Sequence, residues 1–354
     1  MRKYYLDNIR WITVLLVLVY HVFYLFNGVG VLGGVGGFSQ PQYQDAFLYF
    51  VYPWFMVLLF VVSGISSRYA LQTRTDKQFI KARTLKLLVP STLGLLAFQW
   101  IVGWLNLKIG GALALIPPIL RYPIMAMSGV GPLWFIQMLW LFSLLLLLIR
   151  RMDKGDALYR LGGKCGTLCL LLLFLPIWGA AQILNAPVIT TYRFGIYFLA
   201  FLLGYFVFSH DEVMERVEKI RIPALVSAIV LGIAYTWYFF GTNYSDAACL
   251  KHLFTNLYLW IAVLAILGCA KAWLNRTSPF MSYMAKASFG IYIVHYAVVL
   301  SACYFLKTYA TLPTAVIYLV ALAAVLILSP ALYEVIRRIP ILRFCVLGVK
   351  KGSR

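Results

Sequence analysis

Long apolar runs separated by short polar segments recur along the whole chain. Each run is long enough for an α-helix to cross the hydrocarbon core of a bilayer, which takes about 20 residues. We therefore expect an all-α membrane protein, folded as a bundle of ten transmembrane helices. The predicted spans are residues 9–26, 47–67, 87–107, 133–149, 168–184, 193–209, 222–240, 254–271, 287–307 and 312–335.

The composition agrees with this pattern. Of the 354 residues, 63% are hydrophobic and only 12% are charged, whereas a soluble protein needs a more charged surface. The cytoplasmic links are too short to hold a folded soluble domain. We expect one ten-helix domain over residues 1–335, followed by a short basic cytoplasmic tail over residues 336–354.

The basic residues predict how the bundle is oriented, because lysine and arginine beside a span stay in the cytoplasm. With the N-terminus inside, 26 of the 31 basic residues fall on cytoplasmic segments, so both termini are expected to be cytoplasmic. The net charge of +20 is thus spread over many loops. This distribution predicts anionic membrane lipids as partners and no binding to nucleic acid. The basic residues predicted outside are Lys108, Arg121, Arg193, Lys251 and Lys307.

Two segments predicted on the outer side are unusual in composition. Residues 28–46 are rich in glycine, and residues 109–132 form an apolar stretch broken by proline. Glycine permits tight backbone turns, and a proline-broken apolar stretch suits a re-entrant or interfacial piece. Both segments would cover the outer mouth of the bundle, unless they are plain loops.

His21 lies in the middle of the first apolar span, eleven residues after Arg10. Eleven residues are about three helical turns, so the two side chains share one face, roughly 16 Å apart along the axis. Ionisable residues within membrane helices are energetically costly and usually functional. The alternative is a histidine that only hydrogen-bonds inside the bundle.

A second histidine lies at a similar depth in the ninth span. His295 is nine residues into that span from its cytoplasmic end, or roughly 13 Å deep at 1.5 Å per residue. Two histidines at one depth predict a shared polar cavity, although either could be a buried hydrogen-bond partner. Histidine suits general-base catalysis near neutral pH, whereas arginine binds anions or stabilises negative charge.

A basic segment follows the second span. The span ends with small residues that include Ser63 and Gly64, and Arg83 and Lys86 lie three residues apart before the third span. Such a cation pair could bind phosphates, and small residues allow close approach of a helix or a ligand. Helix packing and the retention of positive charge inside explain the same residues. Transfer of an acyl group from a phosphate-bearing cytosolic donor is one function that fits this arrangement.

No metal site is expected from the cysteines. Cys165 and Cys169 are four residues apart, but no histidine or acidic residue beside them completes a metal-binding pattern. Apolar packing explains them better. We expect no tightly bound cofactor.

Together, these motifs resemble acyltransferase family 3, the integral-membrane bacterial O-acyltransferases of surface polysaccharides and other glycans. The resemblance covers nearly the whole chain in order. Its motifs are Tyr5-Leu6-Asp7-Asn8-Ile9-Arg10, Arg10-x10-His21, Phe60-Val61-Val62-Ser63-Gly64, Arg83-x2-Lys86, Gly131-Pro132-Leu133-Trp134-Phe135 and Ser288-Phe289-Gly290-Ile291-Tyr292-Ile293-Val294-His295.

The resemblance implies O-acetylation or a related acyl transfer at the bacterial cytoplasmic (inner) membrane. The donor substrate would be acetyl-CoA or another acyl-CoA, and the acceptor a hydroxyl of a glycan or of a lipid-linked sugar. His21 would be the catalytic base and Arg10 its essential partner. Arg83 and Lys86 would bind the donor, although the family usually has arginine at both positions, and lysine lacks the bidentate fork.

Further roles follow from the same resemblance and the predicted positions. We expect Asp7 to orient Arg10 and His295 to act together with His21. Ser63, Gly64 and Tyr292 are expected on the donor side. Trp134 is expected on the acceptor side, or else in the aromatic belt of the membrane.

Other interpretations remain open from sequence alone. In a transporter or flippase of a glycan or lipid, His21 and His295 would relay protons and Arg10 would bind an anionic substrate. The chain shows no internal repeat of the kind that many transporters have. A structural or sensory membrane protein would leave both histidines unexplained. Within the acyltransferase interpretation, a double displacement through an acyl-histidine is the alternative to direct transfer.

Overall fold

The computed structural model describes residues 3–153, 155–187 and 191–350, and most of them are helical. Arg2 and residues 351–354, predicted on the cytoplasmic side, lie outside the described residues. The first half contains α1 (Tyr4–Leu25), η1 (Tyr43–Asp45), α2 (Ala46–Val51), α3 (Phe55–Thr73), α4 (Asp76–Arg83), η2 (Thr84–Leu88), η3 (Leu95–Gln99), α5 (Trp100–Ile109), η4 (Leu113–Leu115), α6 (Pro118–Ser128), η5 (Gly131–Leu133) and α7 (Trp134–Met152). The second half contains α8 (Ala157–Gly163), α9 (Thr167–Leu172), α10 (Phe174–Ala180), β1 (Asn185–Pro187), β2 (Thr191–Arg193), α11 (Phe194–Phe206), α12 (Asp211–Lys219), α13 (Arg221–Phe239), α14 (Ala247–Lys251), α15 (Leu253–Trp273), α16 (Pro279–Tyr309), α17 (Thr314–Arg338) and α18 (Pro340–Leu347).

The helices confirm an all-α, multi-pass membrane protein. Over the described residues, seven segments are long and apolar enough to cross a membrane, and two bent helix pairs would raise this number to nine. The count of ten and the cytoplasmic location of both termini stay predictions. The seven segments are Tyr4–Leu25, Tyr43–Thr73, Gly131–Met152, Arg221–Phe239, Leu253–Trp273, Pro279–Tyr309 and Thr314–Arg338.

Three of the predicted spans are not among these seven segments, because their helices are divided, short or bent. The third, 87–107, is divided among η2, η3 and α5 by a turn over residues 89–92. This turn contains Pro90, which supplies no backbone N–H for a continuous helix. The fifth, 168–184, holds α9 and α10, which bend by 111° from α8. The sixth, 193–209, holds the 13-residue α11, and α12 turns away from it by 109°.

A short hairpin departs from the purely helical prediction. Strands β1 and β2 pair antiparallel, with Asn185 opposite Arg193. Arg193 is only 1% exposed, and its guanidinium donates hydrogen bonds to the carbonyl of Leu250 and to the side-chain oxygen of Asn256, at 3.0 and 3.1 Å. This anchorage fixes the adjacent Tyr192, whose position matters for the site described below.

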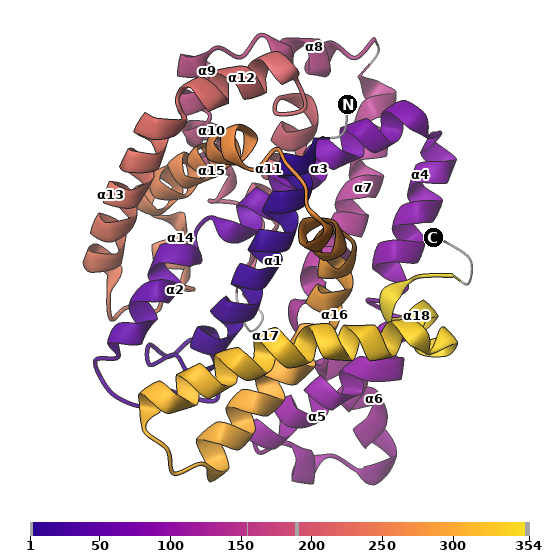
Figure 1. Ribbon diagram of the computed structural model, residues 1–354, viewed down its shortest axis with the longest axis vertical. Coiled ribbons are helices and arrows are strands. Elements are labelled where there is room, and N and C mark those ends of the chain that lie inside the picture. The colour runs from indigo at the N-terminus through magenta and orange to yellow at the C-terminus, as the bar shows by residue number, and fades with distance from the viewer. Residues whose placement is uncertain (1–2, 154, 188–190, 351–354) are drawn as a thin grey trace.

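Helix α1 lies in the middle of the molecule and packs against α3, α15, α16 and α17 (Figure 1). Its polar residues therefore face the interior of the bundle, where other helices can contact them. The predicted tail, 336–354, begins within α17 and contains α18, whose Val346 and Leu347 are buried. Helix α6, within the predicted outer piece 109–132, packs back against α5.

The glycine-rich loop between α1 and α2 is held in place by side chains. Asp45 accepts a hydrogen bond from the backbone N–H of Gly28 at 2.8 Å, and Gln42 donates to the carbonyl of Phe26 at 2.7 Å. From α16, Lys307 donates to the carbonyl of Gly37 at 2.7 Å. We call this side of the bundle the loop end, and the opposite side, where α1 begins beside Arg68 and Arg83, the basic end.

Helices α3 and α11 approach each other at two glycines. A Cβ atom on Gly64 would lie 2.0 Å from the carbonyl oxygen of Phe201, and a Cβ on Gly204 would lie 2.1 Å from that of Val61. Only residues without side chains fit such a backbone approach, as at other membrane helix interfaces. Gly64 is therefore part of the α3–α11 packing.

This packing predicts that Gly64→Ala destabilises the protein by about 1–3 kcal/mol, the usual cost of overpacking a close contact. Gly179→Ala is the matched control, because Gly179 is also helical and has nothing within 4 Å of the added Cβ. Thermal unfolding of both variants in lipid nanodiscs measures the effect. If Gly64→Ala unfolds at the wild-type temperature, the close approach is not a stabilising contact.

Candidate active site

His21 of α1 and His295 of α16 contact each other inside the bundle. Nδ1 of His21 lies 3.2 Å from Nε2 of His295, and the ring centroids are 5.0 Å apart. Each ring also bonds to its own helix: Nδ1 of His21 is 2.8 Å from the carbonyl of Val17, and Nδ1 of His295 is 2.6 Å from that of Tyr292. The two histidines predicted at one depth thus form a pair.

The carbonyl contacts decide where the protons lie. A carbonyl oxygen only accepts hydrogen bonds, so Nδ1 carries a proton in both rings. Nε2 of His295 can then accept from Nδ1–H of His21, which is shared between Val17 and His295. In neutral His21 the lone pair is on Nε2, and this nitrogen has no hydrogen-bond partner among the described residues. Nε2 is therefore the nitrogen of His21 that is available to accept a proton.

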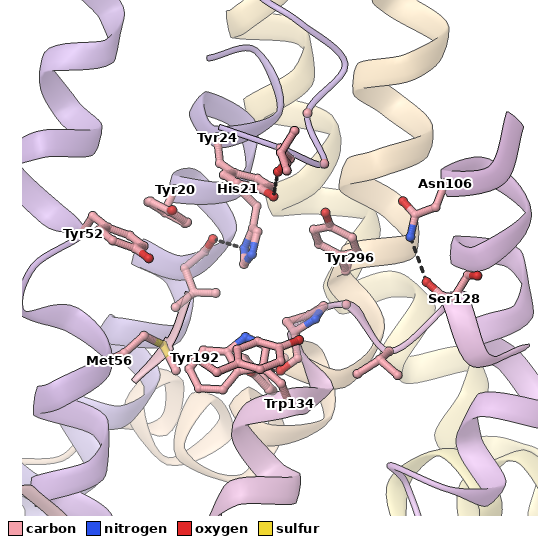
Figure 2. A pocket seen from close by; sticks show the side chains of 18 of the residues that line it. Tyr20, His21, Tyr24, Tyr52, Met56, Asn106, Ser128, Trp134, Tyr192 and Tyr296 are labelled. Carbon is pink, nitrogen blue, oxygen red and sulfur yellow. Dashed lines mark hydrogen bonds between the residues drawn. The ribbon is translucent and has the colours of Figure 1, made fainter. Parts of the chain in front are cut away.

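His21 lines a cavity of about 770 Å³, whereas His295 is buried behind it with no exposed surface. Figure 2 shows the ring of His21 pointing into the cavity, with Tyr296 on one side and Trp134 and Tyr192 on the opposite wall. Residues 32–34 of the glycine-rich loop line the cavity at the loop end. The cavity is also lined by seven tyrosines, Tyr20, Tyr24, Tyr52, Tyr192, Tyr197, Tyr292 and Tyr296.

A cluster of cations lies at the basic end, around the last turns of α3. Arg10 pairs with Asp7 at 3.0 Å and donates a hydrogen bond to the hydroxyl of Ser66. Arg83 donates to the hydroxyl of Ser67 at 2.8 Å. Lys86 is exposed, and its ammonium group lies over the ring of Phe289, 5.1 Å from the centroid. We call Arg10, Arg83 and Lys86 the basic cluster.

The charges of the basic cluster act on one another. Burial, together with the positive charges of Arg10 and Arg74, lowers the pKa of Arg83 to about 10. Arg83 is still cationic at neutral pH. Its hydrogen-bond partner is the neutral hydroxyl of Ser67, and no carboxylate among the described residues forms an ion pair with it, so its repulsion from the other cations is not offset there. An anion bound between these side chains would relieve the repulsion, which makes the cluster suited to phosphate groups.

The other predicted site residues have the following places. Trp134 and Tyr292 both line the cavity, and the hydroxyl of Tyr292 donates to the carbonyl of Pro132. The carbonyl of Ser63 accepts a hydrogen bond at 2.8 Å from the hydroxyl of Ser67, which in turn contacts Arg83 of the basic cluster. Gly64 lies against α11. The assigned roles of these residues stay predictions.

The sequence analysis overlooked several residues of this site. Ser66 and Ser67 hold Arg10 and Arg83, and their only signal is that they continue the run of small residues before Arg68. Tyr192 reaches the cavity from the β1–β2 hairpin, which the hydrophobic pattern does not reveal.

Comparison with known proteins places the chain in a family. Residues 3–334 match the family described as "Acyltransferase domain". Relatives include "Glucans biosynthesis protein C" of Escherichia coli O81 (strain ED1a), of Shigella boydii serotype 4 (strain Sb227) and of Escherichia coli (strain K12). Each is 22% identical over 382 aligned residues, which cover 98% of this chain and 94% of the relative.

No solved structure is a significant match to the chain. The family match nevertheless extends over nearly all of the helices, from the start of α1 to the last turns of α17, and it includes both histidines and the basic cluster. The resemblance found in the sequence motifs is therefore confirmed: the chain belongs to acyltransferase family 3 and is an integral-membrane acyltransferase.

Proposed function

We propose that the protein transfers an acetyl group from acetyl-CoA to a hydroxyl of a cell-surface glycan or of its lipid-linked precursor, at the bacterial cytoplasmic membrane. The observation that carries this proposal is the orientation of His21. Its Nδ1 is bonded to a carbonyl and to His295, and its Nε2 faces a cavity large enough for a substrate.

The proposed reaction is direct transfer with His21 as general base. Nε2 of His21 takes the proton of the acceptor hydroxyl while the hydroxyl oxygen forms a bond with the carbonyl carbon of the thioester. The carbon–sulfur bond then breaks, and His21 returns the proton to the leaving CoA thiolate. Histidine suits both steps because it can accept and release a proton near neutral pH.

The basic cluster is the proposed site of the CoA phosphates. Arg10 and His21 share one face of α1 about 16 Å apart, and Val17 lies between them and also lines the cavity. This separation resembles the reach of the pantetheine arm, so the phosphates can stay at the basic end while the thioester reaches His21. Asp7 would hold Arg10, and Lys86 would supply charge without the bidentate fork of arginine.

His295 is proposed as a positioning residue. It has no contact with the cavity, but its Nε2 accepts from Nδ1–H of His21 and so keeps the lone pair of His21 on Nε2. After His21 takes up a proton, the same acceptor stabilises the imidazolium form. His295 would thus do for His21 what the aspartate of a Ser-His-Asp triad does for its histidine: hold the tautomer and stabilise the protonated ring.

A glycan acceptor is supported by the relatives, whose printed name assigns them to the biosynthesis of glucans. Membership of an acyltransferase family also favours this proposal over a transporter or flippase with a His21–His295 proton relay. The acceptor would then approach from the loop end, where the cavity is lined by the glycine-rich loop.

His21→Ala is expected to lower the rate of acyl transfer by about 10²–10⁴-fold, the usual contribution of a general base. The release of CoA from acetyl-CoA and the labelling of a glucan acceptor are measured with the protein in nanodiscs. His252→Ala is the matched control, since His252 is exposed and does not line the cavity. Wild-type turnover in His21→Ala would refute the proposed base, and an acyl group trapped on the wild type without acceptor would indicate double displacement.

Arg83→Ala is expected to raise KM for acetyl-CoA by about tenfold to a hundredfold, because a hydrogen bond to a charged group contributes about 1.5–3 kcal/mol. A smaller effect is expected on kcat, since Arg83 is remote from the reacting atoms. Lys86→Arg should lower KM by restoring a bidentate donor. Arg121→Ala, on α6, is the control. An unchanged KM in Arg83→Ala would place the CoA phosphates elsewhere.

His295→Ala is expected to lower kcat by about 10²-fold, the size of effect that a misplaced reacting group produces, with KM for acetyl-CoA unchanged. His295→Asn should recover part of kcat, because its side-chain oxygen can accept from His21. Steady-state kinetics and thermal unfolding are measured together. If His295→Ala lowers the unfolding temperature, and if kcat and the affinity for acetyl-CoA fall together with it, His295 serves the fold alone.

A further inference from the structure

We propose that the cavity beside His21 is a binding site for an uncharged sugar, with Trp134 and Tyr192 as the wall on which the sugar ring stacks. This inference rests on the proposed function, because it identifies the acceptor side of that reaction. It adds that the bound sugar is uncharged, and it names the residues that recognise it.

The lining of the cavity combines aromatic and apolar side chains with hydroxyl and amide groups, and it carries no formal charge while His21 is neutral. Among the described residues that line it there is no aspartate, glutamate, lysine or arginine. A charged group brought into such a site would lose its hydration without gaining an ion-pair partner, which is costly. CoA phosphates and acidic sugars are therefore disfavoured here, and a neutral polar ligand is favoured.

Several hydroxyl groups in the cavity have no partner within the protein. Tyr52, Tyr197 and Tyr296 line the cavity, and none of their hydroxyls bonds to another of the described residues. These hydroxyls are also not among the fully buried polar atoms without a partner, so they face the space of the cavity. Buried polar groups in proteins are ordinarily hydrogen-bonded. A ligand with several hydroxyl groups would satisfy these tyrosines, and a sugar presents such groups around its ring.

An aromatic wall stands across the cavity from His21 (Figure 2). The ring centroid of Trp134 lies 5.5 Å from that of Tyr197, with the two planes 25° apart. It also lies 5.5 Å from that of Tyr192, with those planes 31° apart, so Trp134 joins the two tyrosines into one aromatic surface. Tyr192 and Trp134 are only partly buried. Aromatic rings combine an apolar face with a polar edge, which matches a pyranose ring with its apolar C–H face and its equatorial hydroxyls.

The geometry also separates the two substrates. The cavity contains His21 but none of the three residues of the basic cluster, and it is lined by Gly33 and Gly34 at the loop end. A sugar stacked on Trp134 would thus face Nε2 of His21 from the loop end. The donor would reach the same nitrogen from the basic end.

The test measures sugar binding without turnover. The full chain carrying His21→Ala is placed in nanodiscs and titrated by calorimetry with cellotetraose and laminaritetraose, two neutral glucose tetrasaccharides, and with tetragalacturonate, an acidic tetrasaccharide of the same length. Tyr192→Ala and Trp134→Ala are added in the same background. Trp237→Ala is the matched control, because Trp237 is 82% exposed and does not line the cavity.

We expect at least one neutral tetrasaccharide to bind saturably and at least about tenfold more tightly than tetragalacturonate. Tyr192→Ala and Trp134→Ala should each weaken that binding by about tenfold, the size expected for a lost stacking contact. Trp237→Ala and Arg83→Ala should leave sugar binding unchanged. Tyr192→Ala, in turn, should leave the binding of inorganic pyrophosphate at the basic cluster unchanged.

Equal or tighter binding of tetragalacturonate would overturn the proposal, and so would binding that Tyr192→Ala and Trp134→Ala leave intact. The comparison of neutral and acidic tetrasaccharides needs only the His21→Ala protein, so it holds even if a wall variant fails to fold. Absence of binding by both neutral tetrasaccharides would also overturn the sugar site. If acetyl-CoA turnover by the wild type persisted in that case, the proposed function would stand without this site.

Discussion

The hydrogen bond between Nδ1 of His21 and the carbonyl of Val17 is the constraint on which the proposed site depends. It joins the ring of His21, the proposed base, to its own helix one turn earlier, and it places the lone pair on the nitrogen that faces the cavity. His295 reinforces the same tautomer from α16. Because α1 packs in the middle of the bundle, both bonds are held by rigid helices rather than by loops.

The same helix explains how one site could serve two unlike substrates. Arg10 and His21 lie on one face of α1, with the basic cluster at one end and the uncharged cavity at the other. At the basic end, serine hydroxyls hold Arg10 and Arg83 in place. In the cavity, Trp134 packs against the ring of Tyr197. The first region suits an anionic group and the second a neutral one. A CoA phosphate would be stabilised at the basic end and penalised in the cavity.

Helical periodicity predicted that Arg10 and His21 share one face of α1, and depth predicted that His21 and His295 share a polar cavity. Periodicity and depth are regular, local properties of long helices. The structure brings the two histidine rings into contact, but only His21 lines the cavity. The break at Pro90 is local, because proline cannot continue the backbone hydrogen bonds of a helix. The position of Tyr192 and the serines that hold Arg10 and Arg83 depend instead on contacts between separate segments, which the pattern of hydrophobic residues does not reveal. Gly64 shows the limit well, since a ligand contact and a helix contact both call for a small residue there.

The most direct test of the account is transfer across a sealed membrane. Protein in proteoliposomes is given acetyl-CoA on one side and a neutral glucan oligosaccharide on the other, or both on the same side, and acylated oligosaccharide is measured. We expect product only when the two substrates are on opposite sides, because acetyl-CoA would enter at the basic end and the oligosaccharide at the loop end. Equal product with both substrates on one side would contradict it.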